Sequence, residues 1–208
     1  MTLRVWGRLS SVNVQKVVWC AEELGLAYER LDVGGTFGGT KTPDYLAKNP
    51  NSLVPVLEEA DGWTMHESNA IVRYLAAKHP ANGLWPSDAR HRAEMDQWME
   101  WQSNEFTPSM RDAFWHLIRM APAERDMKAV EASVASSGRF ATILDTHLAK
   151  RRYIAGDAFS AADIVNGCAA HRWLNLPIER PAVPNLQRWY GELTSRPASR
   201  QVTSLALS

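Results

Sequence analysis

Apolar residues in the first eighty positions recur at two spacings, one typical of strands and one typical of helices. Leu3 and Val5 lie two apart, whereas Val14, Val17 and Leu24 follow helical spacing. The pattern predicts the order βαβ-α-ββα. The expected strands are 3–6, 28–33, 53–57 and 63–65, and the expected helices are 14–24, 42–48 and one opening at 67–75.

A stretch rich in proline and glycine, 79–86, separates this alternation from a different second half. No later segment has the pattern of a strand. The expected helices are 88–118 with a bend at Pro108, 121–149 with breaks near 136–138, one beginning at 159, and 184–195. We therefore expect an α/β domain over 1–80, a linker over 81–87 and an all-helical domain over 88–208.

Composition narrows the function classes. The 208 residues carry 23 basic and 23 acidic side chains, so no charge excess favours nucleic acid or an anionic membrane. Two distant cysteines, Cys20 and Cys168, make no disulfide framework and favour a reducing compartment. The first residues have no signal-peptide stretch and no run has membrane-helix length, which favours the cytoplasm. The histidines lack metal-ligand spacing, so we expect no metal.

Two short motifs about a dozen residues apart resemble a clamp for a peptide. Proline at Pro55 has no N–H, and a cis Val54-Pro55 bond would turn the Val54 amide and carbonyl away from the sheet. Those groups could pair with an extended ligand. Glu67 and Ser68 open a helix, whose free amides attract a carboxylate. The pair suits a short, acidic, extended ligand.

Several pieces, in this order and spacing, resemble the glutathione S-transferase superfamily, and most closely its bacterial serine-type branch near the theta and phi classes. The resemblance implies a thioredoxin-like glutathione domain followed by an all-helical domain. It also implies glutathione as co-substrate and a role in detoxification. The matching pieces are 11–17 (SVNVQKV), 22–25 (EELG), 49–50 (NP), 54–57 (VPVL), 67–71 (ESNAI), 74–75 (YL), 156–157 (GD) and 160–164 (SAADI).

The resemblance also assigns the glutathione-binding residues. Val54 would pair its backbone with the cysteinyl unit, and Pro55 would hold the cis bond. Glu67 would bind the γ-glutamyl ammonium and Ser68 its carboxylate. Capping of the helix is the alternative for Glu67-Ser68 alone.

One position departs from the family pattern. Many relatives have Lys or Gln before Val-Pro to hold the glycyl carboxylate, whereas this chain has Leu53. Lys41 and Lys48 are weak candidates for that contact, because an exposed lysine is the simpler interpretation of each.

The sulfur of glutathione should lie at the start of the first helix. The resemblance places the catalytic hydroxyl at Ser11, which would donate its proton to the thiolate. From the residues alone, capping of the helix by Ser10 or Ser11 is the alternative. Asn13 also offers a donor, and Ser10 is a third candidate for the sulfur contact.

Two other catalytic types fit poorly. Cysteine-type enzymes need a reactive cysteine at this helix start, but Cys20 lies inside the helix at a buried spacing. Tyrosine-type enzymes need a tyrosine near the end of the first strand, where this chain has Trp6.

The long helix beyond residue 88 should provide the site for a small hydrophobic electrophile. The residues expected to line it are Glu105, Phe106, Met110, Arg111, Phe114 and Trp115. The aromatic pair Trp98 and Trp101 indicates core packing or the interface of a homodimer. Ser160 and Asp163 have the spacing of a capping box, which we prefer to a catalytic pair.

We therefore expect an enzyme that conjugates glutathione to hydrophobic electrophiles. A glutathione-dependent peroxidase or dehalogenase at the same site is an alternative. A non-catalytic protein that keeps the fold for ligand binding or assembly is another, since fold does not fix function.

Overall fold

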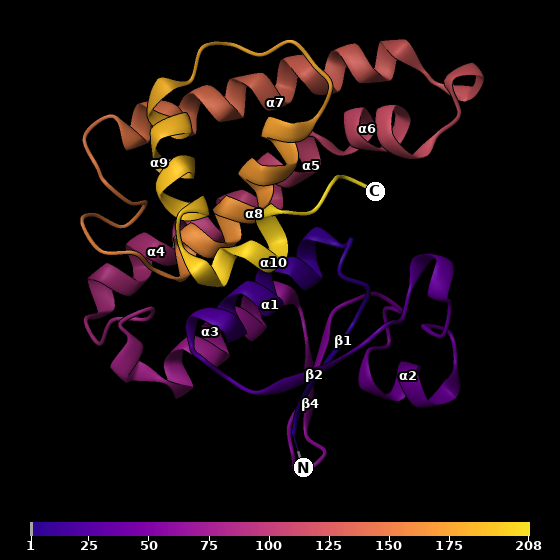
Figure 1. Ribbon diagram of the computed structural model, residues 1–208, viewed down its shortest axis with the longest axis vertical. Helices are drawn as coiled ribbons and strands as arrows, with labels where there is room; N and C mark the ends of the chain where they lie inside the picture. The colour runs from indigo at the N-terminus through magenta and orange to yellow at the C-terminus, as the bar shows by residue number, and fades with distance from the viewer. Residues whose placement is uncertain (1) are drawn as a thin grey trace.

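The computed structural model describes residues 2–208 and contains a small sheet domain beneath a larger helical domain (Figure 1). The sheet order is β2-β1-β3-β4, with β1 parallel to β2 and the other pairs antiparallel. The predicted order βαβ-α-ββα is confirmed. Its elements are β1 (Leu3–Trp6), α1 (Val12–Glu23), β2 (Tyr28–Leu31), α2 (Pro43–Lys48), β3 (Val56–Glu58), β4 (Thr64–His66) and α3 (Ser68–Lys78).

The boundaries shift where local chemistry stops a strand or starts a helix. β3 begins only at Val56, because the cis Val54-Pro55 bond takes the preceding residues out of the ladder. The first helix begins at Val12, two residues earlier than its apolar spacing predicts. Thr42 caps α2 through its hydroxyl, with Pro43 in the first turn as expected.

The second half is helical, and its two longest predicted segments differ from the structure. Its helices are α4 (Ala89–Trp101), α5 (Thr107–Ser109), α6 (Arg111–Phe114), α7 (Met127–Leu148), α8 (Ala161–Asn175), α9 (Pro184–Thr194) and α10 (Arg200–Thr203). The predicted single helix 88–118 is wrong, because π-helical turns occupy 102–106 and 115–119 and Met110 leaves helical geometry. Pro108 cannot donate a backbone bond to the preceding turn, and the interruptions lie on both sides of it, at 102–106 and at Met110.

The break predicted near 136–138 is also wrong, because α7 continues through it. A Cβ at Gly138 would lie 3.5 Å from Pro181, and Trp173 donates its indole N–H to the Ser137 hydroxyl at 3.2 Å. The small residues therefore serve close packing in α7 rather than ending the helix.

The central helix α8 joins the two domains. Figure 1 shows it inside the helical half, with α1 and α3 between it and the sheet. At Gly167 a Cβ would lie 3.0 Å from the Trp19 ring of α1 and 2.8 Å from Leu193 of α9. The missing side chain thus lets α8 cross α1 closely. This crossing fixes the position of α1 against the helical domain.

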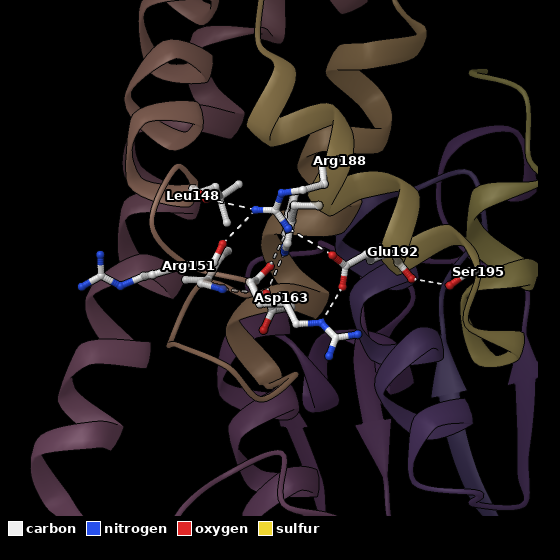
Figure 2. Close-up of polar contacts among 9 residues, drawn as sticks. Leu148, Arg151, Asp163, Arg188, Glu192 and Ser195 are labelled. Atoms are coloured by element: carbon white, nitrogen blue, oxygen red, sulfur yellow. Dashed lines mark hydrogen bonds and ion pairs between the residues drawn. The ribbon is translucent and has the colours of Figure 1, made fainter.

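Asp163, near the start of α8, accepts hydrogen bonds from three segments of the helical domain and so has a structural role (Figure 2). One carboxylate oxygen accepts the backbone N–H and the hydroxyl of Ser160, each at 2.9 Å. The other accepts the Ile154 N–H and the Trp189 indole N–H, also at 2.9 Å. Burial raises the pKa of Asp163 to about 6 despite these donors. The predicted capping role is confirmed.

Candidate active site

The end of β1, the start of α1 and the Val54-Pro55 turn meet at Gly7. A Cβ there would lie 2.4 Å from a Val14 methyl and 3.2 Å from the Val54 Cβ. Only glycine permits this approach, and its φ of 152° adds to the requirement. Val54 and Pro55 are thereby held beside the first turn of α1.

The Val54-Pro55 bond is cis, and the Val54 backbone has free hydrogen-bonding groups. Within residues 2–208, neither its amide nor its carbonyl pairs with another backbone group. The carbonyl before it is occupied, since Leu53 accepts from the Tyr45 hydroxyl at 2.8 Å and the Asn49 amide at 2.9 Å. Just before the start of β3, the main chain of one residue can therefore pair with an extended ligand, as an added strand would.

Ser11 stands at the N-cap of α1 but does not cap it. Its side chain accepts no hydrogen bond from the first turn, although its carbonyl accepts the Gln15 N–H at 2.9 Å. The hydroxyl is therefore available to donate at a helix N-terminus, where the dipole favours a negative charge. Its neighbours Ser10 and Asn13 line two separate cavities, and Ser11 itself lines neither of them.

Glu67 and Ser68 form one wall of a cavity of about 530 Å³ at the start of α3. Glu67 is the N-cap residue and has a φ of 71°, a conformation that few non-glycine residues adopt. Its side chain makes no capping bond and is exposed, whereas Ser68 is buried. Asn13 reaches the same cavity from α1, so the structure brings Asn13 together with Glu67-Ser68.

Lys16 lies beneath this cavity, and the sequence analysis missed it. Only 1 % of the residue is exposed, and its ammonium group donates to Asn69 Oδ1 at 3.1 Å and to Ser68 Oγ at 3.4 Å. Burial lowers the pKa of Lys16 to about 8. The available signal was a lysine inside an apolar run, between Val14 and Val17, at a position that faces the core.

The candidates for a glycyl-carboxylate contact are not gathered at Val54. Leu53 points outward with 64 % of its surface exposed. Lys48 donates to Glu58 at 3.0 Å and covers the Trp6 ring, so it is already paired at the sheet. Lys41 is an exposed residue of the loop before α2.

The residues expected to line the second-substrate site divide into two groups. Phe106 and Met110 are fully buried and Phe114 is 5 % exposed, so the first two cannot touch a ligand in this conformation. The interruptions of the long helix turn them into the core. Trp115 is 48 % exposed, and Glu105 and Arg111 are exposed as well.

A cavity of about 450 Å³ lies between the two domains, next to the start of α1. None of the six expected wall residues lines it. It is lined by Arg8, Ser10, Gly35, Thr36, Arg119 and Ser208. Arg8 and Arg119 were not recognised from the sequence, because isolated arginines in different domains have no pattern that links them.

The two cysteines are unsuited to thiolate chemistry. Both are fully buried, and burial raises the pKa of the Cys20 thiol far above its usual range and that of Cys168 to about 12. The interpretation of Cys20 as a small buried residue is confirmed.

Two further properties of the described residues concern membrane-spanning helices and metal sites. No helix within 2–208 combines the length and apolar character needed to cross a membrane. Among the same residues, no three His, Cys, Asp or Glu side chains come together in a way that could hold a metal ion.

Comparisons with known proteins agree with this geometry. The glutathione S-transferase N-terminal domain family matches residues 6–83, and the C-terminal domain family matches residues 106–197. Glutathione S-transferase GstB of Escherichia coli K12 is 40 % identical over 207 residues, covering 99 % of this chain and 100 % of that protein. A probable glutathione S-transferase of rice, GSTF2, is 32 % identical over 98 % of this chain and 96 % of its own.

The solved structures extend the agreement to the whole fold. The theta class glutathione S-transferase of Xanthomonas axonopodis pv. citri, solved with glutathione bound, is 44 % identical with a TM-score of 0.96, and each chain covers 100 % of the other. The expected two-part fold and the resemblance drawn from the short motifs are confirmed. This chain therefore belongs to the glutathione S-transferase family of enzymes.

Proposed function

We propose that this enzyme binds glutathione along Val54 and at the start of α3, and transfers it to a small electrophile. The observation that carries the proposal is the free backbone amide and carbonyl of Val54 beside an uncapped α1 start. Glutathione is an acidic, extended tripeptide, and these groups match its backbone. The bound ligand in the Xanthomonas relative supports the same ligand here.

The γ-glutamyl end would occupy the 530 Å³ cavity. Glu67 would pair with its ammonium group, and Ser68 with its carboxylate, assisted by the amides at the start of α3. Lys16 holds Ser68 and Asn69 from below and adds positive charge near that carboxylate. With the cysteinyl unit on Val54, the sulfur would lie near Ser11.

The chemical step is nucleophilic attack by the glutathione thiolate. The thiol loses its proton to solvent, the sulfur forms a bond to the electrophilic carbon, and the leaving group departs with its electron pair. Donation from Ser11 and the positive end of the α1 dipole would favour thiolate over thiol. Holding both reactants together supplies much of the remaining rate.

Retention on immobilised glutathione, followed by a panel of electrophiles, tests the proposal. We expect retention and conjugation of at least one haloaromatic, detected as the thioether product. Peroxides in the same panel separate conjugation from a peroxidase reaction. A protein that neither binds glutathione in calorimetry nor consumes it with any electrophile would be a ligand-binding or assembly protein, contrary to the proposal.

A further inference from the structure

Three arginines from both domains gather around the 450 Å³ cavity beside Ser10. Arg8 follows β1, Arg119 ends the second π-helical turn, and Arg172 lies in α8. Arg8 and Arg119 line this cavity, whereas Arg172 lines a separate, nearly closed space of about 10 Å³ that Ser10 and Ser208 also border.

Each guanidinium is held in place by its surroundings. A Cβ on Gly35 would lie 2.8 Å from Arg8 Nε, so the glycine backbone lets the arginine lie flat against the loop. Arg119 and Arg172 both stack on Phe114, at 4.9 and 4.0 Å from the ring centre. These two guanidinium carbons are therefore no more than 8.9 Å apart.

No Asp or Glu side chain in the part of the chain that the structure describes pairs with the cluster. None of the three arginines forms an ion pair there. Arg119 donates to the backbone carbonyl of Ser208 at 3.1 Å. Burial, with Arg119 and Arg8 nearby, lowers the pKa of Arg172 to about 10. Mutual repulsion of this kind is relieved when an anion binds among the charges.

We propose that this cavity selects a second substrate that carries an anionic group, such as an aryl carboxylate or sulfonate, for conjugation to glutathione. The anion would lie beside Arg8 and Arg119, and Arg172 would add its charge nearby, since it shares the Phe114 ring with Arg119. Ser10 borders the cavity, so the reactive carbon would lie near the sulfur at Ser11. The inference rests on the proposed function and names its substrate class.

Two product analogues test the charge directly and need no turnover. S-(4-carboxy-2-nitrophenyl)glutathione carries the anion, and its 4-carbamoyl counterpart has nearly the same shape without the charge. We expect the wild-type enzyme to bind the carboxylate about 10-fold more tightly in calorimetry. This preference should shrink as salt is added, because exposed charges are screened.

Arginine variants locate the effect. Arg119→Gln should remove most of the preference while leaving affinity for glutathione unchanged, since Arg119 is exposed and does not line the cavity at Glu67 and Ser68. Arg172→Gln should do likewise, and Arg172→Lys should restore part of the preference by restoring the charge. Arg139→Gln is the matched control, because Arg139 is also exposed and stacked on a phenylalanine, Phe140, and its variant should keep the full preference.

Several results would overturn the inference. Equal binding of both analogues by the wild type refutes the substrate class while leaving glutathione transfer intact. A preference that survives in the Arg119→Gln/Arg172→Gln double variant refutes the site. If Arg8→Gln weakens glutathione itself as much as either analogue, Arg8 belongs to the glutathione site instead. If the wild type binds neither analogue nor glutathione, the proposed function fails and this inference fails with it.

Discussion

Replacing the buried Lys16 by methionine should separate folding stability from glutathione binding. The substitution keeps the length and apolar stem of the side chain but removes the ammonium group beneath Ser68 and Asn69. A buried charge without an ion-pair partner opposes folding, so its presence here indicates a use in binding.

The size of the folding cost follows from the shift in pKa. Lowering the pKa of Lys16 from 10.5 to about 8 corresponds to about 3 kcal/mol at pH 7, since one unit is worth about 1.4 kcal/mol. The folded-state value is below the unfolded one, so the unfolded chain binds more protons between pH 8 and 10.5. The free energy of unfolding should therefore rise with pH across that window.

In Lys16→Met this rise should disappear. At pH 7 the variant should gain up to about 3 kcal/mol, less about 1–3 kcal/mol for leaving the buried Asn69 oxygen without its donor. The net change in stability is therefore small, whereas the difference in pH slope between the two proteins is large. Urea unfolding at pH 7 and at several values up to pH 10 measures both quantities.

Glutathione affinity should fall in Lys16→Met. Without Lys16, Ser68 and Asn69 lose their support and the γ-glutamyl carboxylate loses a nearby positive charge, so we expect about a 10-fold weaker Kd in calorimetry. Lys150→Met removes an exposed lysine and should change neither property. A Lys16→Met variant that loses stability at every pH, keeps the wild-type pH slope and binds glutathione normally would refute the reasoning.

Four further outcomes are expected. Ser11→Ala should lower turnover more than glutathione affinity and move the rate profile to higher pH; the same shift in Asn13→Ala alone would reassign the sulfur contact. Ser68→Ala should weaken glutathione binding by about 1.5–3 kcal/mol in calorimetry, and unchanged affinity would remove α3 from the site. Asp163→Ala should cost at least about 3 kcal/mol in urea unfolding, because four buried donors lose their acceptor. Sedimentation should show a homodimer at micromolar concentration, paired through the aromatic surface of α4; a monomer would contradict this.

Local patterns in the sequence were enough for much of the fold. Alternation and helical spacing predicted the order of the sheet domain, since both periods follow from backbone geometry within a few residues. Val54-Pro55 and the Ser160–Asp163 capping box were also local, because each depends on bonds formed inside one turn.

Other features depended on contacts between distant segments, and only the tertiary structure decided them. Gly138 lies inside α7, where its missing side chain makes room for Pro181 from a later loop. Phe106 was predicted to line the substrate site, but the π-helical turn that ends there directs it into the core. A helical period of 3.6 residues carried through 102–106 could not show this change of face, because a π-helical turn has a different period.

The charges at the site show the same division most clearly. The sequence identifies Lys16 as a lysine in an apolar helix, but whether it is buried, and against which groups, depends on α3, over fifty residues away. Arg8, Arg119 and Arg172 come from different elements and meet only because α8 crosses α1 closely and joins the two domains. Sequence periodicity records which residues are apolar within an element, whereas the electrostatics of a site arise from how the elements pack.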